Sequence, residues 1–136
     1  MKLIMLTSLF LIITYQFPVK AEELFSVSSE ERNISAFDYV VTEIKREKGY
    51  SILNIPKFQE RTAAASRWMM CAYTELAMLR NANMWAAVYS DDSGDNVTVV
   101  FPDSKNLNDP AFDNVDLLNT EPKIMRTGAL RKYCGL

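Results

Sequence analysis

Two cysteines are the residues of this sequence with the clearest capacity for covalent chemistry, and the chain contains no histidine. Without histidine, Ser–His–Asp and Cys–His catalysis and every histidine zinc site are excluded, and two cysteines alone cannot make a structural zinc site. In an oxidising compartment an even pair of cysteines indicates a disulfide. We therefore predict that Cys71 and Cys134 are bonded and pin the C-terminal tail to the core. Two buried free thiols are the alternative.

Carboxylates are the remaining candidates for catalysis, because acid–base chemistry by a pair of Asp or Glu side chains needs no other residue type. Asp38 and Glu43 are such candidates, but their spacing does not show that they meet. The chain has no nucleophile elbow and no phosphate-binding glycine loop. The sequence therefore assigns no catalytic residue, and a hydrolase that uses carboxylates alone is kept as an alternative.

An acidic cluster between residues 91 and 96 offers the oxygen ligands that calcium prefers. Its members are Asp91, Asp92, Asp95 and Asn96. The cluster lacks the spacing of a calcium-binding loop and the distant bidentate glutamate, so we interpret it as a solvated hairpin turn. The sequence predicts no metal and no cofactor.

Aromatic and methionine side chains in one stretch could line a ligand site, although such residues on a helix and the following strand more often form a core. They are Trp68, Met69, Met70, Tyr73, Trp85 and Tyr89. Met70 and Met78 fall on the helix side opposite the main apolar stripe, so either another layer or a partner covers them. These two methionines mark the predicted partner surface.

The start of the chain has the pattern of a secretory signal. Lys2 precedes an apolar run over residues 3–15, and Val19-Lys20-Ala21 places small residues at the positions that signal peptidase reads. The run is shorter than the roughly 20 apolar residues that span a bilayer. We expect residues 1–21 to be a cleavable signal peptide that leaves no membrane anchor and directs the protein to the periplasm or outside the cell.

The charge of the chain argues against one class of partner. The sequence has 15 basic and 17 acidic residues, and loss of Lys2 and Lys20 with the signal takes the net charge from −2 to −4. The basic clusters, at residues 45–48 and 131–132, are small. A mildly acidic chain without a basic stripe is a poor binder of nucleic acid or of an anionic membrane, so we expect neither partner.

The first half of the chain predicts a polar lead-in, a hairpin and one long helix. Residues 22–36 are charged and serine-rich, and we expect their start to be poorly ordered. The segments 37–44 and 50–55, rich in β-branched and aromatic residues, predict a hairpin around a charged turn. A helix over residues 37–48 is the alternative. Pro56 suits the first turn of a helix that continues to Arg80 without glycine or proline.

One face of this helix is predicted to be buried, at about 100° per residue. The apolar stripe consists of Phe58, Ala65, Trp68, Met69, Ala72, Leu76 and Leu79. Glu60, Arg67 and Thr74 fall on the opposite face. Alanines in the stripe would let the helix approach a sheet closely.

The second half predicts another hairpin, from residues 84–90 and 97–101, joined by the acidic turn. Residues 103–122 are polar and loop-like, and residues 123–133 predict a last strand followed by a short turn of helix. Together the elements predict an α+β domain over residues 37–136, after a lead-in at 22–36. It is a mainly antiparallel sheet with one long helix packed on a face and a C-terminal tail pinned by the disulfide.

The segment Ala63–Tyr89 also carries a resemblance. Its Cys71-Ala72-Tyr73, Leu76-Ala77 and Trp85-Ala86-Ala87-Val88 stretches lie in a helix and the aromatic-containing strand after it. This order resembles small uncharacterised domains of the bacterial envelope, many of them lipoproteins. The lipid-anchoring cysteine of such proteins is absent, since Glu22 follows the expected cleavage site. The resemblance implies no activity.

Elimination favours a non-catalytic exported domain that acts by binding another protein in the cell envelope. A narrower hypothesis makes it an inhibitor or an immunity protein against an envelope-targeted toxin or enzyme. The alternatives are a carboxylate-dependent periplasmic hydrolase and a structural subunit of an envelope assembly whose methionines a neighbour covers.

Overall fold

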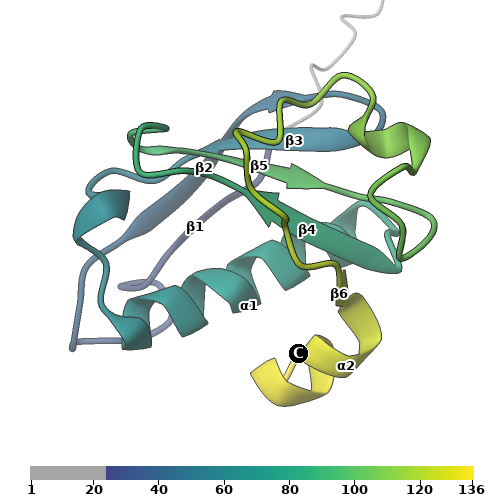
Figure 1. Ribbon diagram of the computed structural model, residues 1–136. Helices are drawn as coiled ribbons and strands as arrows, with labels where there is room; N and C mark the ends of the chain where they lie inside the picture. The colour runs from purple at the N-terminus through teal and green to yellow at the C-terminus, as the bar shows by residue number, and fades with distance from the viewer. Residues whose placement is uncertain (1–23) are drawn as a thin grey trace, which may run out of the picture.

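The computed structural model describes residues 24–136, which form one antiparallel six-stranded sheet with a long helix against one face (Figure 1). The strands are β1 (Ser26–Ser28), β2 (Val40–Arg46), β3 (Tyr50–Asn54), β4 (Met84–Val88), β5 (Asn96–Val100) and β6 (Met125–Arg126). The helices are α1 (Ala63–Leu79) and α2 (Thr127–Cys134), with 3₁₀ turns η1 (Phe58–Glu60) and η2 (Pro110–Phe112). The predicted α+β fold is confirmed. The signal peptide expected over residues 1–21 lies outside the described residues.

The strands follow the order β1-β2-β3-β5-β4-β6, and every neighbouring pair is antiparallel. Both predicted hairpins are present, because β2 pairs with β3 and β4 pairs with β5. β6 and α2 occupy the positions of the predicted last strand and short helix. β1 and β6 are therefore the two end strands of the sheet.

The segment expected as a polar lead-in contains one of these end strands. β1 pairs with β2, with Val27 opposite Val41. Phe25 and Val27 are 7 % and 3 % exposed and belong to the core. The folded domain thus begins before residue 37, because alternate side chains of this short segment reach the helix-covered face of the sheet.

α1 starts later than its sequence predicts. Lys57 takes a left-handed conformation (φ 65°), and η1 then makes a single turn that buries Phe58. Thr62 caps α1, because its side-chain oxygen accepts a hydrogen bond at 3.2 Å from a backbone N–H of the first turn. The prediction that Pro56 opens the helix is wrong: burial of Phe58 turns the chain first, and Thr62 offers the better cap.

The buried face of α1 is rotated from the predicted stripe. Leu79, expected inside, is 62 % exposed, whereas Thr74, expected outside, is fully buried. Trp85 on β4 accounts for the difference. Its indole N–H donates to the Thr74 hydroxyl at 3.1 Å, and its ring packs edge-on against Tyr73. The helix therefore turns its Tyr73–Ala77 side toward β4.

Strand β2 carries a bulge that decides where two charged side chains point. Glu43 pairs with Leu53, but the next pair joins Lys45 to Ile52, so Ile44 is an extra residue. Side chains alternate along a regular strand, which would send Glu43 and Arg46 to opposite faces. The extra residue brings both to the same face, where they bond to each other.

The sheet is covered on both faces. On one face, strand residues such as Val41, Leu53, Val97 and Val99 pack against α1. On the other, a second cluster of Ala86, Val88, Val100 and Phe112 lies under the loop that follows β5. Figure 1 shows this loop crossing the sheet on the side away from α1 before the chain reaches β6.

A disulfide joins the two helices. Cys71 on α1 and Cys134 on α2 are bonded, with their Cα atoms 5.7 Å apart, which confirms the predicted pairing. Such a bond is typical of proteins that fold in an oxidising compartment. Within residues 24–136, no helix has the length and apolarity needed to cross a membrane.

Removing this disulfide should destabilise the domain strongly. The cysteines are 63 residues apart in sequence, and closing a loop of that length contributes about 4 kcal/mol in the chain-entropy model. We expect the double variant Cys71→Ser with Cys134→Ser to lose about 4 kcal/mol of unfolding free energy in urea titrations. A loss below about 1 kcal/mol would show that the bond does not restrain the unfolded chain in this way.

Candidate functional site

The main candidate site is a cleft of about 500 Å³ between the first half of α1, the strand β4 and the segment 120–125. η1 closes one end of it with Phe58, and the chain just after η1 contributes Arg61. The segment 120–125 forms the outer wall and leads directly into β6. Three stretches that are distant in sequence thus build one hollow, which we call the cleft.

The floor of the cleft is apolar and already packed. Met69, Tyr73 and Trp85 line it and are 1 %, 5 % and 3 % exposed. Tyr73 and Trp85 contact edge to face, with ring centroids 5.5 Å apart. Because these side chains belong to the core, the floor keeps its shape without a ligand, as is usual for binding sites.

Arg61 sits over the aromatic end of the cleft. Its guanidinium carbon lies 3.8 Å from the ring centroid of Phe58 and 4.9 Å from that of Tyr89. These two rings pack edge to face, with centroids 4.9 Å apart. Cation–π contact and a 2.9 Å hydrogen bond from Arg61 to the Phe58 carbonyl fix the guanidinium in place.

The rim carries an excess of positive charge. Arg61, Arg67 and Lys123 line the cleft together with one carboxylate, Glu121. None of these three cations forms an ion pair with another residue of the described chain. In a protein whose net charge is negative, this cleft is a local positive site.

The hydroxyl of Tyr73 is a polar group inside the apolar floor. Burial raises the pKa of Tyr73 above its ordinary value of 10.0; the neighbouring Tyr89 adds to this, and Arg61 opposes it. The hydroxyl is therefore protonated at every physiological pH. It makes no hydrogen bond to any residue from 24 to 136.

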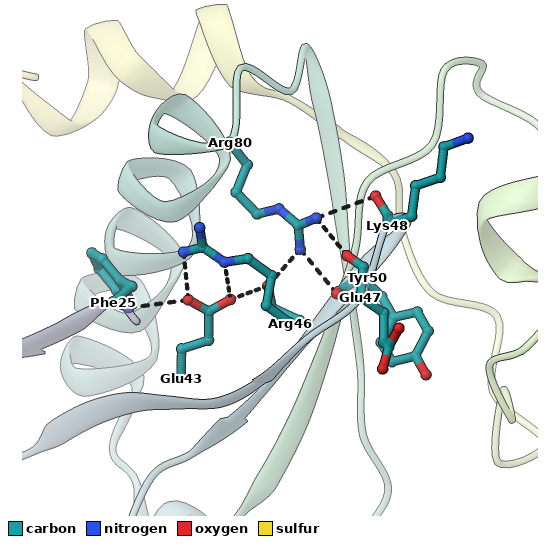
Figure 2. A network of polar contacts seen from close by, with 8 residues as sticks. Phe25, Glu43, Arg46, Glu47, Lys48, Tyr50 and Arg80 are labelled. Carbon is teal, nitrogen blue, oxygen red and sulfur yellow. Dashed lines mark hydrogen bonds and ion pairs between the residues drawn. The ribbon is translucent and has the colours of Figure 1, made fainter. Parts of the chain in front are cut away.

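The candidate carboxylate pair does not form a catalytic site. Asp38 is exposed beside a shallow hollow with Ile34 and Phe37, whereas Glu43 is 2 % exposed and points into the α1 face. The Glu43 carboxylate accepts hydrogen bonds from Arg46 Nε and Nη2, from the Phe25 backbone N–H and from Ser51 Oγ (Figure 2). Glu43 lines neither the cleft nor the hollow beside Asp38.

The pKa of Glu43 agrees with a structural role. Burial alone raises it, but hydrogen bonds from Arg46, Ser51 and Phe25 and the charge of Arg46 outweigh burial, so the pKa lies below its ordinary value of 4.5. A general acid needs the opposite shift. Glu43 is thus a fixed, ionised anchor.

A second arginine extends this network to the end of α1. Ser51 Oγ accepts a 2.8 Å hydrogen bond from Arg80, the residue that caps α1. Arg80 also donates to the backbone carbonyls of Glu47, Lys48 and Tyr50 in the β2–β3 turn (Figure 2). The network therefore ties the helix end to the hairpin.

The other residues singled out in the sequence lie in several places. Met70 lines the cleft, but Met78, eight residues further along α1, does not. Trp68 packs against Phe37 with centroids 6.1 Å apart and lines a separate hollow beside the disulfide. The acidic turn at residues 91–96 is exposed. Among residues 24–136, no group of three or more Cys, Asp or Glu side chains could hold a metal ion.

Sequence reasoning missed two parts of the cleft. The sequence predicts Arg61 inside a helix, and no sequence pattern indicates its contact with Phe58 and Tyr89. The wall begins in the segment 103–122, which the sequence predicts as loop, and nothing in its composition shows which surface it covers. Tyr73, Trp85, Tyr89 and the methionine pair could be named, because their clustering is visible along the chain.

No known protein family, no curated protein and no solved structure matches this chain. Its function must therefore be inferred from its own geometry.

The Glu43 network predicts a specific pH dependence of stability. Because the pKa of Glu43 is lowered on folding, its contribution is present above pH 4.5 and is lost as the pH falls through the lowered pKa. We expect Glu43→Gln to reduce the unfolding free energy at pH 7 by about 1–3 kcal/mol, since Arg46 and Ser51 lose a charged acceptor. The variant should also lose part of the fall in stability below pH 4.5.

Urea titrations from pH 3 to pH 7 would test this, with Glu60→Gln as the control because Glu60 is exposed. Parallel pH curves for wild type and Glu43→Gln would contradict the assignment.

Proposed function

We propose that the protein is an exported, non-catalytic domain that binds another protein, and that the cleft is its contact site. The observation that carries the proposal is the cleft itself: a preformed aromatic and methionine floor under a rim of unpaired cations. Apolar anchors in a pocket surrounded by charged residues are the usual centre of a protein interface. Methionine adds a polarisable surface that adapts to a partner side chain.

The alternatives gain less support from the geometry. A carboxylate-dependent hydrolase needs a proton donor beside its substrate. Glu43 does not line the cleft, and its pKa is lowered, whereas the pKa of a general acid is raised. A structural subunit needs a broad apolar contact face, whereas the exposed large apolar side chains of residues 24–136 lie in several places. They are Leu24 before β1, Val40 and Ile44 on β2, Leu79 at the end of α1, Tyr89 after β4, and Tyr133 and Leu136 beside the disulfide. A binding role is supported by the apolar floor and the cationic rim of the cleft. The narrower inhibitor or immunity role stays a hypothesis within it.

A pair of methionine variants tests whether the cleft is the contact site. Met70 and Met78 are both half-buried on α1 and lie about 12 Å apart along its axis at 1.5 Å per residue, but only Met70 lines the cleft. Oxidised protein of residues 22–136 would serve as bait for envelope extracts, with mass spectrometry of what is retained. We expect Met70→Gln to weaken the retained interaction about tenfold and Met78→Gln to leave it unchanged.

Equal losses in both variants would place the contact on the whole helix side instead of the cleft. If neither wild type nor variant retains a stoichiometric partner at micromolar concentration, the binding function is wrong.

A further inference from the structure

The cleft contains polar groups that its own packing leaves without partners. The Tyr73 hydroxyl lies in a side chain only 5 % exposed, lines the cleft and makes no hydrogen bond within residues 24–136. Among residues 24–136 the only side-chain polar atom that is both fully buried and without a hydrogen bond is Thr127 Oγ1, so the Tyr73 oxygen is open to the cleft and available to a ligand. Arg61 lines the same cleft as Tyr73, so two hydrogen-bond donors, the phenol and the guanidinium, border it.

We propose that the cleft binds an acidic segment of a partner polypeptide, which inserts one large apolar side chain and sets a carboxylate against Arg61 and the Tyr73 hydroxyl. This inference rests on the proposed binding function and specifies the chemistry of the partner. The apolar side chain lies on Met69 and Trp85, and the flanking carboxylates face Arg67 and Lys123. A protonated phenol and a guanidinium are both hydrogen-bond donors, so the group they recognise is an acceptor of negative charge.

Charge complementarity selects an acidic occupant. Three cations without ion pairs surround the cleft against the single carboxylate of Glu121. A basic or neutral segment would leave the guanidinium of Arg61 without an anionic acceptor. An acidic one gains charge-assisted hydrogen bonds, which are stronger than those between neutral groups.

The outer wall of the cleft favours a polypeptide as the ligand. Residues 120–124 have no regular structure, and β6 after them is an end strand that pairs with β4 on one side only. Met125 of β6 lines the cleft. An extended segment in the cleft lies against a wall of chain that makes no strand pairs before Met125, so main-chain hydrogen bonds can supplement the side-chain contacts.

Calorimetric titration of the oxidised protein with short blocked peptides tests the proposal. The probe is acetyl-Glu-Asp-Phe-Asp-Glu-amide. One control peptide replaces all four acids by their amides, and another replaces the phenylalanine by alanine. We expect the probe to bind at least tenfold more tightly than either control and to weaken as salt is raised.

Variants of the protein locate the bound carboxylate. Tyr73→Phe removes only a hydroxyl that has no internal partner, so its Tm should equal that of wild type while its affinity for the probe falls about tenfold. Arg67→Gln should also weaken binding. Lys132→Gln, on α2 and away from the cleft, is the matched control and should change nothing.

Equal binding of the acidic and amide peptides would overturn the inference, as would an unchanged affinity in Tyr73→Phe. Self-association of the protein that blocks the probe would also overturn it, because the occupant would then be a second copy. If wild type and Tyr73→Phe retain the same partner from extract equally well, the protein binds a partner, but the Tyr73 hydroxyl does not bind a carboxylate of it. The comparison of the acidic and amide peptides tests the inference without any natural partner.

Discussion

The ionised carboxylate of Glu43 is the constraint around which the rest of the domain is arranged. A charge this deeply buried is tolerated only when donors surround it, and the donors here come from the residue before β1 and from β2 and β3. The bulge at Ile44 is required for Arg46 to reach the same face. Through Ser51 the network continues to Arg80 and so fixes where α1 ends. The hydrogen bonds around this one carboxylate therefore connect the edge of the sheet, the bulge in β2 and the C-terminal end of α1.

The cleft follows from the way α1 is seated against β4. Because Trp85 donates to Thr74, the helix is rotated so that its Tyr73–Ala77 side faces the strand. This seating buries the floor of the cleft and leaves Met70 at its wall. The separate hollow beside the disulfide lies where α2 packs on α1. The same helix thus supplies a packed core, a binding floor and a docking face for the C-terminal helix.

The elements that the sequence predicts well are those with a strong local pattern. The β-branched segments around Val41 and Val99 became hairpins, and the stretch without glycine or proline before Arg80 became α1. The disulfide followed from cysteine number and compartment. The start of α1 could not be predicted, because Pro56 is the helix-start signal in the sequence, and only the folded chain shows that the burial of Phe58 turns the chain before Thr62 caps the helix.

The remaining misses have tertiary causes. β1 has three residues, too few to show an alternating pattern in the sequence. It forms because Phe25 and Val27 are buried in the core and the Phe25 N–H donates a hydrogen bond to Glu43. Thr74 is polar but buried, since it receives a hydrogen bond from a residue on another element. About a third of the residues that line the cleft were visible in the sequence as an aromatic and methionine cluster. Others, among them Arg61 and the wall at residues 120–125, take positions that only the folded chain defines.

The outer wall of the cleft depends on a bond that lies outside it. Residues 120–125 lead through β6 into α2, and the bond from Cys134 to Cys71 holds α2 on α1. The wall is therefore held on its C-terminal side by two attachments, the pairing of β6 with β4 and the disulfide. A reductant that opens the disulfide removes one of them, so the shape of the cleft is coupled to the redox state of its surroundings.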